Sequence, residues 1–297
     1  MRPALAAILL LVIVSLGIFR RARAQASNVI MVDGVERTYE FYVPASVTPD
    51  QATSLVIALH GGGGRGRGMR SLTKFDAVAD EKGFLVAYPD GINRNWNDSR
   101  DFTRNRTDAD DVGFIKSLIA SLKAQYTIER VFITGMSNGA MMTYRLACEL
   151  SDQITAVAPV AGNLVKGYDC KPANPVALLA INGTDDPLVP YNGGTVANDR
   201  GEVISTEDTM TFWATNNGCT GDPSEEALPD SDPNDSSRAY KRTYPACSAP
   251  LILYRIQGGG HTWPGGSQYA PKRLIGVVNR DFDASRVIWE FFDAQGK

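Results

Sequence analysis

The stretch RVFITGMSNGAMMTYRLACEL, residues 130–150, joins a strand-like pattern to a helix-like one through a tight turn. Residues 131–134 are an apolar run typical of a buried strand, and residues 140–150 are rich in Ala, Met and Leu, which favours a helix. Between them lies Gly-Met-Ser-Asn-Gly, centred on Ser137. A strand–G-x-S-x-G–helix turn lifts its serine above the strand and directs free N–H groups of the helix toward a reacting carbonyl. The pattern predicts a nucleophilic serine, and a plain glycine-rich loop is the alternative.

The rest of the chain alternates strand-like and helix-like segments. Continuous apolar runs predict strands that are covered on both faces of a sheet, and amphipathic runs predict helices. The expected buried strands are residues 55–59, 84–88, 131–134, 154–160, 176–181 and 251–256. The expected helices are residues 71–82, 108–122, 140–150, 207–217 and 284–292. This alternation predicts an α/β fold with a mostly parallel central sheet flanked by helices.

Three further segments have distinctive local patterns. Residues 29–32 and 39–43 flank Asp33-Gly34, a preferred two-residue turn, and predict a β-hairpin. Asp110 and Asp111 begin an expected helix, where acids complement the helix dipole, so they need no metal to explain them. Residues 222–238 are rich in Pro, Ser and acids, which indicates a solvated surface loop.

The N-terminal segment, residues 1–24, differs from everything that follows. An almost wholly apolar run follows Met1-Arg2 and ends before Arg20-Arg21-Ala22-Arg23-Ala24. This order is typical of a secretory signal peptide, and an uncleaved membrane anchor is the alternative. We therefore expect a secreted protein, extracellular or periplasmic, in which residues 25–297 form a single catalytic domain.

The charge balance bears on the kind of partner. The whole chain has 30 Lys and Arg against 33 Asp and Glu, a net charge of −3. Removal of residues 1–24 takes away four arginines and no acid, which leaves a net charge of about −7. A negative chain disfavours nucleic acid as the partner, and it disfavours an anionic membrane unless the N-terminal segment is retained.

The four cysteines, Cys148, Cys170, Cys219 and Cys247, all follow the expected signal peptide. An even number in an exported chain suggests two disulfides, for which three connectivities are possible. We favour the pairing of sequence neighbours, because each bond then closes a short loop. Four buried free thiols are the alternative. A zinc site is disfavoured, because the chain has no C-x-x-C and only two histidines.

A glycine-rich segment, His60-Gly61-Gly62-Gly63-Gly64, follows the strand expected at residues 55–59. Lipase-like enzymes use such an H-G-G-G segment to supply one N–H donor to an oxyanion. The expected donors are the N–H of Gly62 or its neighbour and the N–H of Asn138. A phosphate-binding loop is disfavoured because no Gly-Lys-Ser/Thr follows, and a merely flexible loop remains an alternative.

A serine nucleophile needs a base, and the chain offers only His60 and His261. His60 belongs to the expected oxyanion loop, so His261, in a mobile glycine-rich turn after the last strand, is the expected base. Its three preceding glycines are hard to explain by packing. The third member of a triad would be Asp185 or Asp186, just past the strand expected at residues 176–181. The order Ser, Asp, His is that of α/β-hydrolases, whose ester chemistry needs no metal or organic cofactor.

Seven motifs together resemble the polyhydroxybutyrate depolymerase/feruloyl esterase family of secreted α/β-hydrolases. They are LHGGGG (59–64), YPDG (88–91), NWN (95–97), DDVGFI (110–115), GMSNGAMM (135–142), NGTDDPLVPY (182–191) and GGGHTWPGG (258–266). The resemblance covers nearly all of residues 28–295 and implies an extracellular carboxylic ester hydrolase. It places the triad aspartate on Asp186 and the disulfides on Cys148–Cys170 and Cys219–Cys247. Asn182 stands where the family often has His.

The substrate is expected to be a small or polysaccharide-linked ester. Trp96 and Trp263 flank the expected site, and an aromatic slot suits a feruloyl or other hydroxycinnamoyl ring, although core packing explains each tryptophan equally well. A depolymerase of solid polyester usually has a separate surface-binding module, and no segment of this chain suggests one. Hydrolysis of hydroxyalkanoate oligomers or of acetyl xylan is the alternative activity. An acyltransferase or a non-catalytic binding protein on the same scaffold is a further alternative.

Overall fold

The computed structural model describes residues 28–101 and 108–296. The expected signal peptide, residues 1–24, lies outside the described residues. Among the helices that are described, none is both long and apolar enough to cross a membrane.

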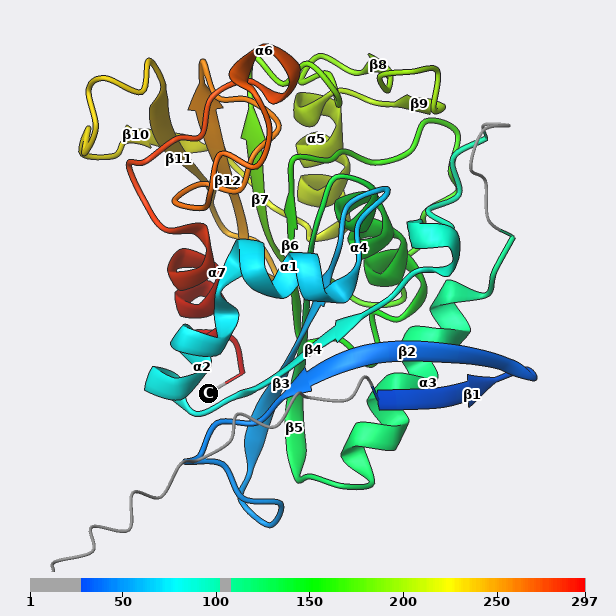
Figure 1. Cartoon of the computed structure of the whole chain (residues 1–297). Helices are drawn as coiled ribbons and strands as arrows, with labels where there is room; N and C mark the ends of the chain where they lie inside the picture. Colours follow the sequence, from blue (N-terminus) through cyan, green and yellow to red (C-terminus); the bar gives the residue numbers. More distant parts are fainter. Residues whose placement is uncertain (1–27, 102–107, 297) are drawn as a thin grey trace, which may run out of the picture.

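A large twisted sheet runs through the described part of the chain (Figure 1). Its ten strands have the order β1-β2-β4-β3-β5-β6-β7-β12-β11-β10. Their bounds are β1 (Asn28–Val32), β2 (Val35–Tyr42), β3 (Thr53–Leu59), β4 (Leu85–Pro89), β5 (Ile128–Met136), β6 (Ala156–Val160), β7 (Ala177–Gly183), β10 (Ser224–Ala227), β11 (Arg238–Tyr244) and β12 (Leu251–Gln257). Neighbouring strands from β4 to β12 are parallel, and the pairs at both ends of the sheet are antiparallel. The mostly parallel central sheet is confirmed.

Helices cover both faces of this sheet. The described helices are α1 (Gly66–Thr73), α2 (Phe75–Lys82), α3 (Asp111–Lys123), α4 (Asn138–Glu149), α5 (Thr206–Asn216), α6 (Lys272–Ile275) and α7 (Ala284–Asp293), with a 3-10 turn η1 (Ile92–Arg94). Buried side chains of α3, α4 and α5 pack in one apolar cluster, and those of α1, α2 and α7 pack in another. A short two-stranded sheet, β8 (Gly194–Thr195) and β9 (Glu202–Val203), lies apart from the main one.

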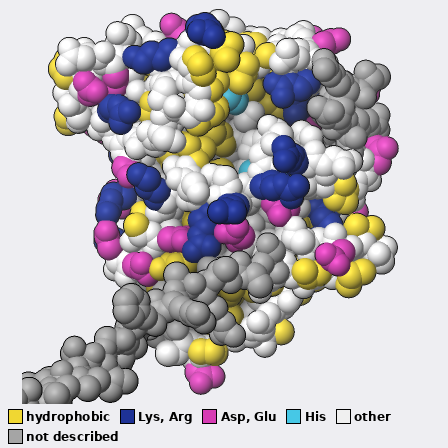
Figure 2. Space-filling model, viewed as in Figure 1, with side chains coloured by type: hydrophobic (Ala, Val, Ile, Leu, Met, Phe, Trp, Pro, Cys, Tyr) yellow, Lys and Arg dark blue, Asp and Glu magenta, His cyan; other side chains and the backbone are white. Residues whose placement is uncertain are grey.

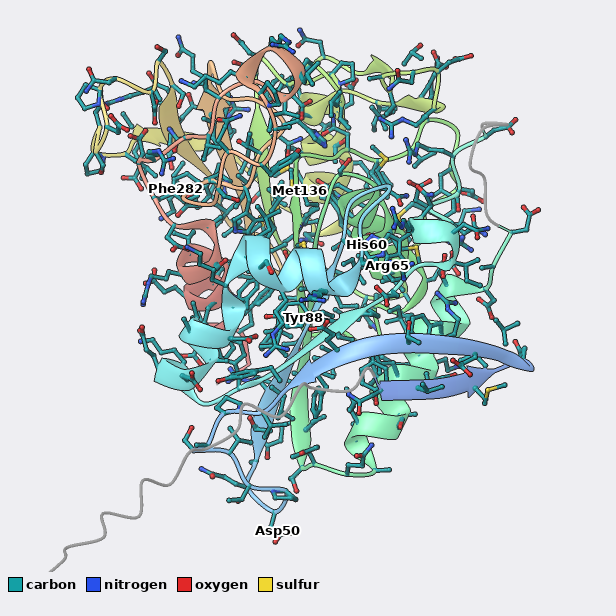
Figure 3. All side chains as sticks on the ribbon, in the orientation of Figure 1. Asp50, His60, Arg65, Tyr88, Met136 and Phe282 are labelled. Carbon is teal, nitrogen blue, oxygen red and sulfur yellow. A yellow bond between two sulfur atoms is a disulfide. The ribbon has the colours of Figure 1, made fainter. Side chains whose placement is uncertain are left out.

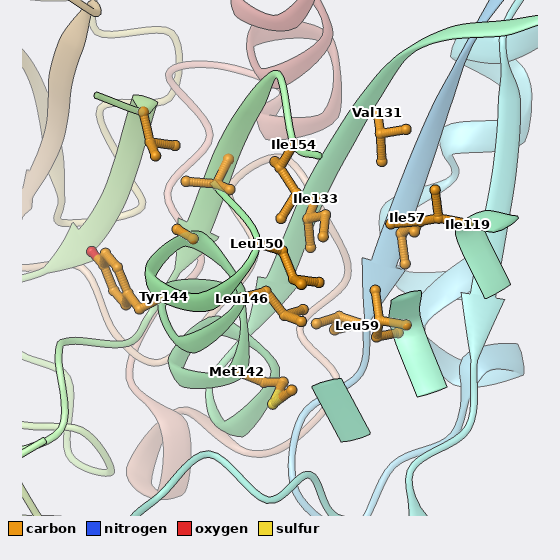
Figure 4. Close-up of a cluster of buried hydrophobic side chains, with 14 of the residues drawn as sticks. Ile57, Leu59, Ile119, Val131, Ile133, Met142, Tyr144, Leu146, Leu150 and Ile154 are labelled. Atoms are coloured by element: carbon orange, nitrogen blue, oxygen red, sulfur yellow. The ribbon is translucent and has the colours of Figure 1, made fainter. Parts of the chain in front are cut away.

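The central strand β3 shows why a continuous apolar run marks this kind of sheet. Leu55, Ile57 and Leu59 belong to the cluster with α3, α4 and α5, while Val56 and Ala58 belong to the opposite cluster. Successive side chains of a strand point to opposite faces, so a strand covered on both faces must be apolar at every position. Figure 4 shows Ile57 and Leu59 packed near side chains of α3, β5 and α4.

The N-terminal hairpin also forms as expected. β1 and β2 pair antiparallel, and Val32 lies opposite Val35 across the turn. Asp33 and Gly34 both have positive φ, 49° and 78°. Two consecutive residues with positive φ give the turn whose twist matches that of the flanking strands, which is why Asp-Gly favours it.

The helix expected at residues 71–82 is two helices in the structure. α1 begins at Gly66, and Lys74, in a left-handed conformation with φ of 53°, separates α1 from α2. The early start was missed because two glycines of α1, Gly66 and Gly68, have poor helix propensity. Gly83 then ends α2 with φ of 76°, as its position predicts.

The expectation of a solvated loop at residues 222–238 is wrong for its ends. β10 and β11 extend the sheet beyond β12 as an antiparallel edge. All four residues of β10 are exposed, so no apolar alternation marks it in the sequence. Glu225 on β10 pairs with Arg242 on β11 and Arg255 on β12, so cross-strand charges hold an edge that has little apolar surface.

Candidate active site

Ser137 occupies a strained turn between β5 and α4. Its φ of 60° and ψ of −121° lie in a region that non-glycine residues rarely adopt. The glycines on either side are required by close packing: a Cβ on Gly135 would meet the carbonyl of Gly139, and a Cβ on Gly139 would meet the carbonyl of Leu59. Strain at Ser137 is therefore imposed by a close contact between β5, α4 and β3. This conformation places the Ser137 hydroxyl at the end of the sheet.

The glycine-rich segment after β3 runs directly beside this turn. A Cβ placed on Gly61 would lie 3.4 Å from the Cβ of Ser137, and one placed on Gly62 would lie 3.7 Å from the Cβ of Asn138. Within the described residues, neither the Gly62 N–H nor the Asn138 N–H donates to another protein group. Asn138 is the first residue of α4, where N–H groups have no acceptor in the helix. Two free N–H groups thus flank Ser137.

His261 follows β12 and meets the loop that follows β7. Its Nδ1 lies 2.7 Å from Oδ2 of Asp186, and both side chains are almost fully buried. The other carboxylate oxygen of Asp186 accepts hydrogen bonds from the N–H groups of Leu188, at 2.7 Å, and Val189, at 2.8 Å. Asp185 instead accepts a hydrogen bond from the Thr184 hydroxyl. Of the two candidate carboxylates, only Asp186 contacts the imidazole.

The glycines before His261 are explained by packing, so the expectation of a mobile turn is wrong. A Cβ on Gly260 would meet the carbonyl of Ile275 and the backbone of Gly276. The His261 N–H donates to the Ile275 carbonyl at 2.6 Å, and the Tyr269 hydroxyl donates to the His261 carbonyl at 2.8 Å. This close backbone contact leaves no room for side chains and fixes the position of the imidazole.

His60 is also buried and lines the same pocket as His261, but backbone groups bond both of its ring nitrogens. Nδ1 donates to the Gly61 carbonyl at 2.8 Å, and Nε2 accepts from the Gly91 N–H at 2.9 Å. Acceptance at Nε2 assigns the neutral tautomer with its proton on Nδ1. Burial lowers the pKa of His60, which favours that neutral form further. Through these two hydrogen bonds, His60 connects the glycine-rich segment to the backbone at Gly91.

These elements surround a pocket of about 530 Å³ at the carboxyl end of the parallel strands. Its lining comprises residues 60–65, Gly68, Met69, Ser71, Leu72, Met136, Ser137, Leu188, Arg200, His261, Ser267 and Tyr269. Figure 2 shows the hollow, with histidine visible in it. Figure 3 shows His60, Arg65 and Met136 near one another beside α1. Ser137 and His261 share this pocket, and Gly62 belongs to its wall.

The structure places Trp96 and Trp263 in the core, so the aromatic slot that we expected from them is wrong. Each is only 1 % exposed, and neither lines the pocket. The Trp96 indole donates to the His60 carbonyl at 2.8 Å, and the Trp263 indole donates to the Ser285 hydroxyl at 3.1 Å. Proximity in sequence to the site motifs cannot reveal which way a ring points. The aromatic residue in the pocket is Tyr269, which is 47 % exposed.

A buried polar network next to the glycine-rich segment was not expected from the sequence. The Asn138 side chain accepts from the Trp96 N–H at 2.8 Å and donates to Oδ2 of Asp98 at 2.6 Å. Asp98 in turn forms an ion pair with Arg100 at 2.7 Å, and both are buried. The network holds the first residue of α4 against the loop after β4. The one indication of this network in the sequence is the NWN motif, residues 95–97, which is followed by Asp98 and Arg100.

Asp110 and Asp111 have different roles from each other. Asp110 caps α3 by accepting from the Gly113 N–H at 2.8 Å, as an acid at a helix start should. Asp111 is fully buried, pairs with Arg37 and accepts from the Asn97 N–H. Burial raises the pKa of Asp111, while Asn97 and Arg37 oppose that shift. The helix dipole alone therefore does not explain Asp111.

Both disulfides join the cysteines that the family resemblance pairs. Cys148 near the end of α4 bonds to Cys170, and Cys219 after α5 bonds to Cys247. Among the residues that the structure describes, no group of three or more His, Cys, Asp or Glu side chains is arranged to hold a metal ion.

Comparison with known proteins identifies the family. Residues 45–213 match the family described as Phospholipase/Carboxylesterase, which is more than half of the chain, so the chain belongs to this family. A Nocardia uniformis subsp. tsuyamanensis protein named as an esterase, NocK, is 30% identical over 92% of this chain and 84% of its own length. Feruloyl esterase C of Emericella nidulans is 29% identical over 87% and 84%. Feruloyl esterase B of Piromyces equi is 31% identical over 73% of this chain, which spans only 41% of that longer protein.

Among solved structures, an acetyl xylan esterase from Aspergillus awamori superposes with a TM-score of 0.56 at 19% identity, over 76% of this chain and 89% of the other. This similarity supports the α/β-hydrolase fold. Together with the family match and the esterase relatives, it establishes the protein as a carboxylic ester hydrolase with that fold. The resemblance seen in the sequence motifs is confirmed.

Proposed function

We propose that this carboxylic ester hydrolase is a secreted serine esterase with a Ser137–His261–Asp186 triad, acting on hydroxycinnamoyl or related esters. The assignment of the triad rests mainly on one observation. The buried hydrogen bond from His261 Nδ1 to Asp186 Oδ2 lies at the wall of the same pocket that exposes Ser137 on its strained turn. Residues 25–297 would be its single catalytic domain.

In this mechanism the Asp186 carboxylate holds the proton on His261 Nδ1, which leaves Nε2 as the basic nitrogen. Nε2 accepts the Ser137 proton as Oγ attacks the ester carbonyl. The N–H groups of Gly62 and Asn138 stabilise the oxyanion that develops on the carbonyl oxygen. His261 then protonates the departing alcohol, and water hydrolyses the acyl-enzyme by the same steps. The negative charge of Asp186 stabilises the imidazolium, and two N–H groups bound to its other oxygen hold the carboxylate in place.

The pocket supports an aromatic or alkyl acyl group as the substrate. Met69, Leu72 and Leu188 give it apolar walls, and the half-exposed ring of Tyr269 is available to stack on a hydroxycinnamoyl ring. Its volume of about 530 Å³ suits a small-molecule ester. Two relatives named as feruloyl esterases agree with this choice. Hydroxyalkanoate oligomers and acetylated xylan are the remaining candidates.

The test is release of product from methyl ferulate, p-nitrophenyl butyrate and suspended polyhydroxybutyrate by wild type and Ser137→Ala. We expect ferulate release that falls by about 10³-fold or more in the variant. Cleavage of the short ester alone would make the protein a general esterase, and soluble hydroxybutyrate would favour the depolymerase. Equal rates for both proteins on all three esters would mean that Ser137 is not the nucleophile.

Secretion is tested separately from activity. If the full-length chain is expressed in a host with an export pathway, we expect the mature protein to lack residues 1–24 and both disulfides to form. The measurement is the intact mass of the exported protein before and after reduction. A membrane-bound protein that retains residues 1–24 would favour the anchor.

A further inference from the structure

The lining of the pocket carries positive charge without any acid. Arg65 and Arg200 both line it, and no Asp or Glu among the described residues does. Figure 2 shows Lys and Arg side chains beside the hollow. Arg65 is exposed, whereas Arg200 is half-buried. A cation in this position can bind an anionic group of a substrate.

Arg200 has no carboxylate partner, unlike the buried arginines elsewhere in the molecule. Arg37 pairs with Asp111, and Arg100 pairs with Asp98. Within the described residues Arg200 forms no ion pair; its Nε donates to the Ala197 carbonyl at 2.8 Å. Residues 102–107, which the structure does not describe, contain no Asp or Glu. The two terminal nitrogens of Arg200 are thus left without an acidic side chain to bind.

The guanidinium is held close to the catalytic end of the pocket. A Cβ placed on Gly62 would lie 3.7 Å from Nη1 of Arg200. The Arg200 carbonyl accepts from Nη1 of Arg100 at 2.8 Å, and Arg100 is anchored by Asp98, which also binds Asn138. The same buried network therefore positions the first residue of α4 and the loop that carries Arg200. The Arg200 carbonyl and the Arg200 Nε are thus both hydrogen-bonded, which limits where the guanidinium can lie.

The surroundings of Arg200 disfavour an unpaired cation. Burial lowers the pKa of Arg200, and the neighbouring charge of Arg100 lowers it further. A bound anion would offset both effects. The planar fork of two terminal N–H₂ groups matches a carboxylate better than any neutral group.

We propose that Arg200 binds a carboxylate carried by the ester substrate, so that the pocket selects anionic esters over neutral esters of the same size. The proposal rests on the proposed function, because it places the carboxylate within reach of Gly62 while the ester carbonyl meets Ser137. Arg200 is then a specificity-determining residue. The carboxylate belongs to either the acyl or the alcohol half of the ester, and the two halves can be tested separately.

The experiment compares matched esters with wild type, Arg200→Gln and Arg200→Lys. For the acyl half the pair is mono-p-nitrophenyl adipate and p-nitrophenyl hexanoate; for the alcohol half it is 4-carboxyphenyl butyrate and 4-carbamoylphenyl butyrate. Ser137→Ala supplies the background rate. Arg286→Gln is the charge-matched control, because Arg286 pairs with Glu81 on the surface and does not line the pocket.

We expect Arg200→Gln to lower kcat/KM for one or both anionic esters by roughly tenfold or more, mainly through KM, while the neutral partners change little. Arg200→Lys should retain part of the preference, because it keeps the charge and loses the fork. Arg286→Gln should keep the wild-type preference. An unchanged ratio of anionic to neutral ester in both pairs in Arg200→Gln overturns the proposal. An equal loss on both members of each pair gives the same unchanged ratio and indicates that Arg200 acts on a step common to all of these esters.

A binding measurement separates this proposal from the choice of nucleophile. The measurement is calorimetry, which needs no turnover. The amide analogues of the acyl pair are adipic acid monoanilide and hexananilide. Those of the alcohol pair are 4-butyramidobenzoate and 4-butyramidobenzamide. We expect at least one carboxylate-bearing amide to bind wild type more tightly than its neutral partner, and Arg200→Gln to lose that difference. If Ser137→Ala hydrolyses every ester at the wild-type rate, the proposed function fails, and these binding data still decide the role of Arg200. If wild type binds the two members of each amide pair equally tightly, the proposal that Arg200 binds a carboxylate is overturned.

Discussion

The two histidines of this chain lie in similar positions but have different hydrogen-bond partners. Both follow a strand of the parallel sheet, both line the same pocket, and they are 2 % and 3 % exposed. The ring nitrogens of His60 bond only backbone groups, one donor and one acceptor, so its neutral form is satisfied. His261 meets the Asp186 carboxylate through Nδ1 and has no protein partner recorded at Nε2 within the described residues. The two rings are therefore equally buried and differ in the groups that bond their nitrogens.

The difference lies in what each ring would gain from a proton. A protonated His60 would lose the hydrogen bond from the Gly91 N–H, because Nε2 would no longer be an acceptor. A protonated His261 would face a carboxylate that two N–H groups hold in place. A carboxylate partner favours imidazolium, whereas a backbone donor opposes it. Four changes test this comparison.

The largest effect is expected from His261→Gln. Loss of the base should lower kcat/KM on p-nitrophenyl butyrate by about 10⁴-fold or more, because a serine hydroxyl is a poor nucleophile without one. Steady-state kinetics measures this, with the thermal unfolding midpoint as a check on folding. A His261→Gln enzyme with near wild-type activity would remove His261 from the triad.

Asp186→Asn should have the next largest effect, a loss of kcat of roughly 10³- to 10⁴-fold, because an amide favours the wrong imidazole tautomer. Asp185→Asn is the matched control, since that neighbouring carboxylate bonds Thr184 and does not contact the ring. We expect the control to keep most of its activity in the same assay. Equal losses in both variants would contradict the distinction between them.

His60→Gln should act mainly on stability. The change removes two part-buried hydrogen bonds and the ring that packs on Trp96, so we expect the free energy of unfolding to fall by about 1–3 kcal/mol. Denaturant titration measures the loss. Activity should fall far less than in His261→Gln. A His60→Gln protein that is fully stable and inactive would reverse the two roles.

The smallest effect is a pH dependence of stability that His60 contributes. Its pKa in the folded protein lies below the usual value of 6.5, so the unfolded state binds more protons as the pH falls below 6.5. Stability is then present above pH 6.5 and decreases below it, by at most about 1.4 kcal/mol per pH unit for one group. Denaturant titrations from pH 7.5 to 5 should show a steeper loss for wild type than for His60→Gln. Parallel curves would mean that His60 does not titrate abnormally.

The sequence alone determined the features that arise within short stretches of chain. Strand, tight turn and helix around Ser137 follow from local composition, and Gly135 is a local steric requirement because its Cβ would meet the Gly139 carbonyl; Gly139 is required instead by the tertiary contact with Leu59. The continuous apolar strands predicted a sheet covered on both faces, and β3 shows why. The family resemblance singled out Asp186, and the structure shows that this carboxylate, not that of Asp185, reaches the imidazole.

Only the tertiary structure decided the features that depend on how distant segments meet. Trp96 and Trp263 point into the core, although their sequence positions suit a pocket wall. The partner of Asp111 is Arg37, which lies on β2, 74 residues earlier in the chain. Arg200 reaches the pocket from a loop with no motif, positioned by a residue 100 positions earlier in the chain. The direction of a side chain and the identity of its partner are set by packing between elements, and no local pattern of residues encodes them.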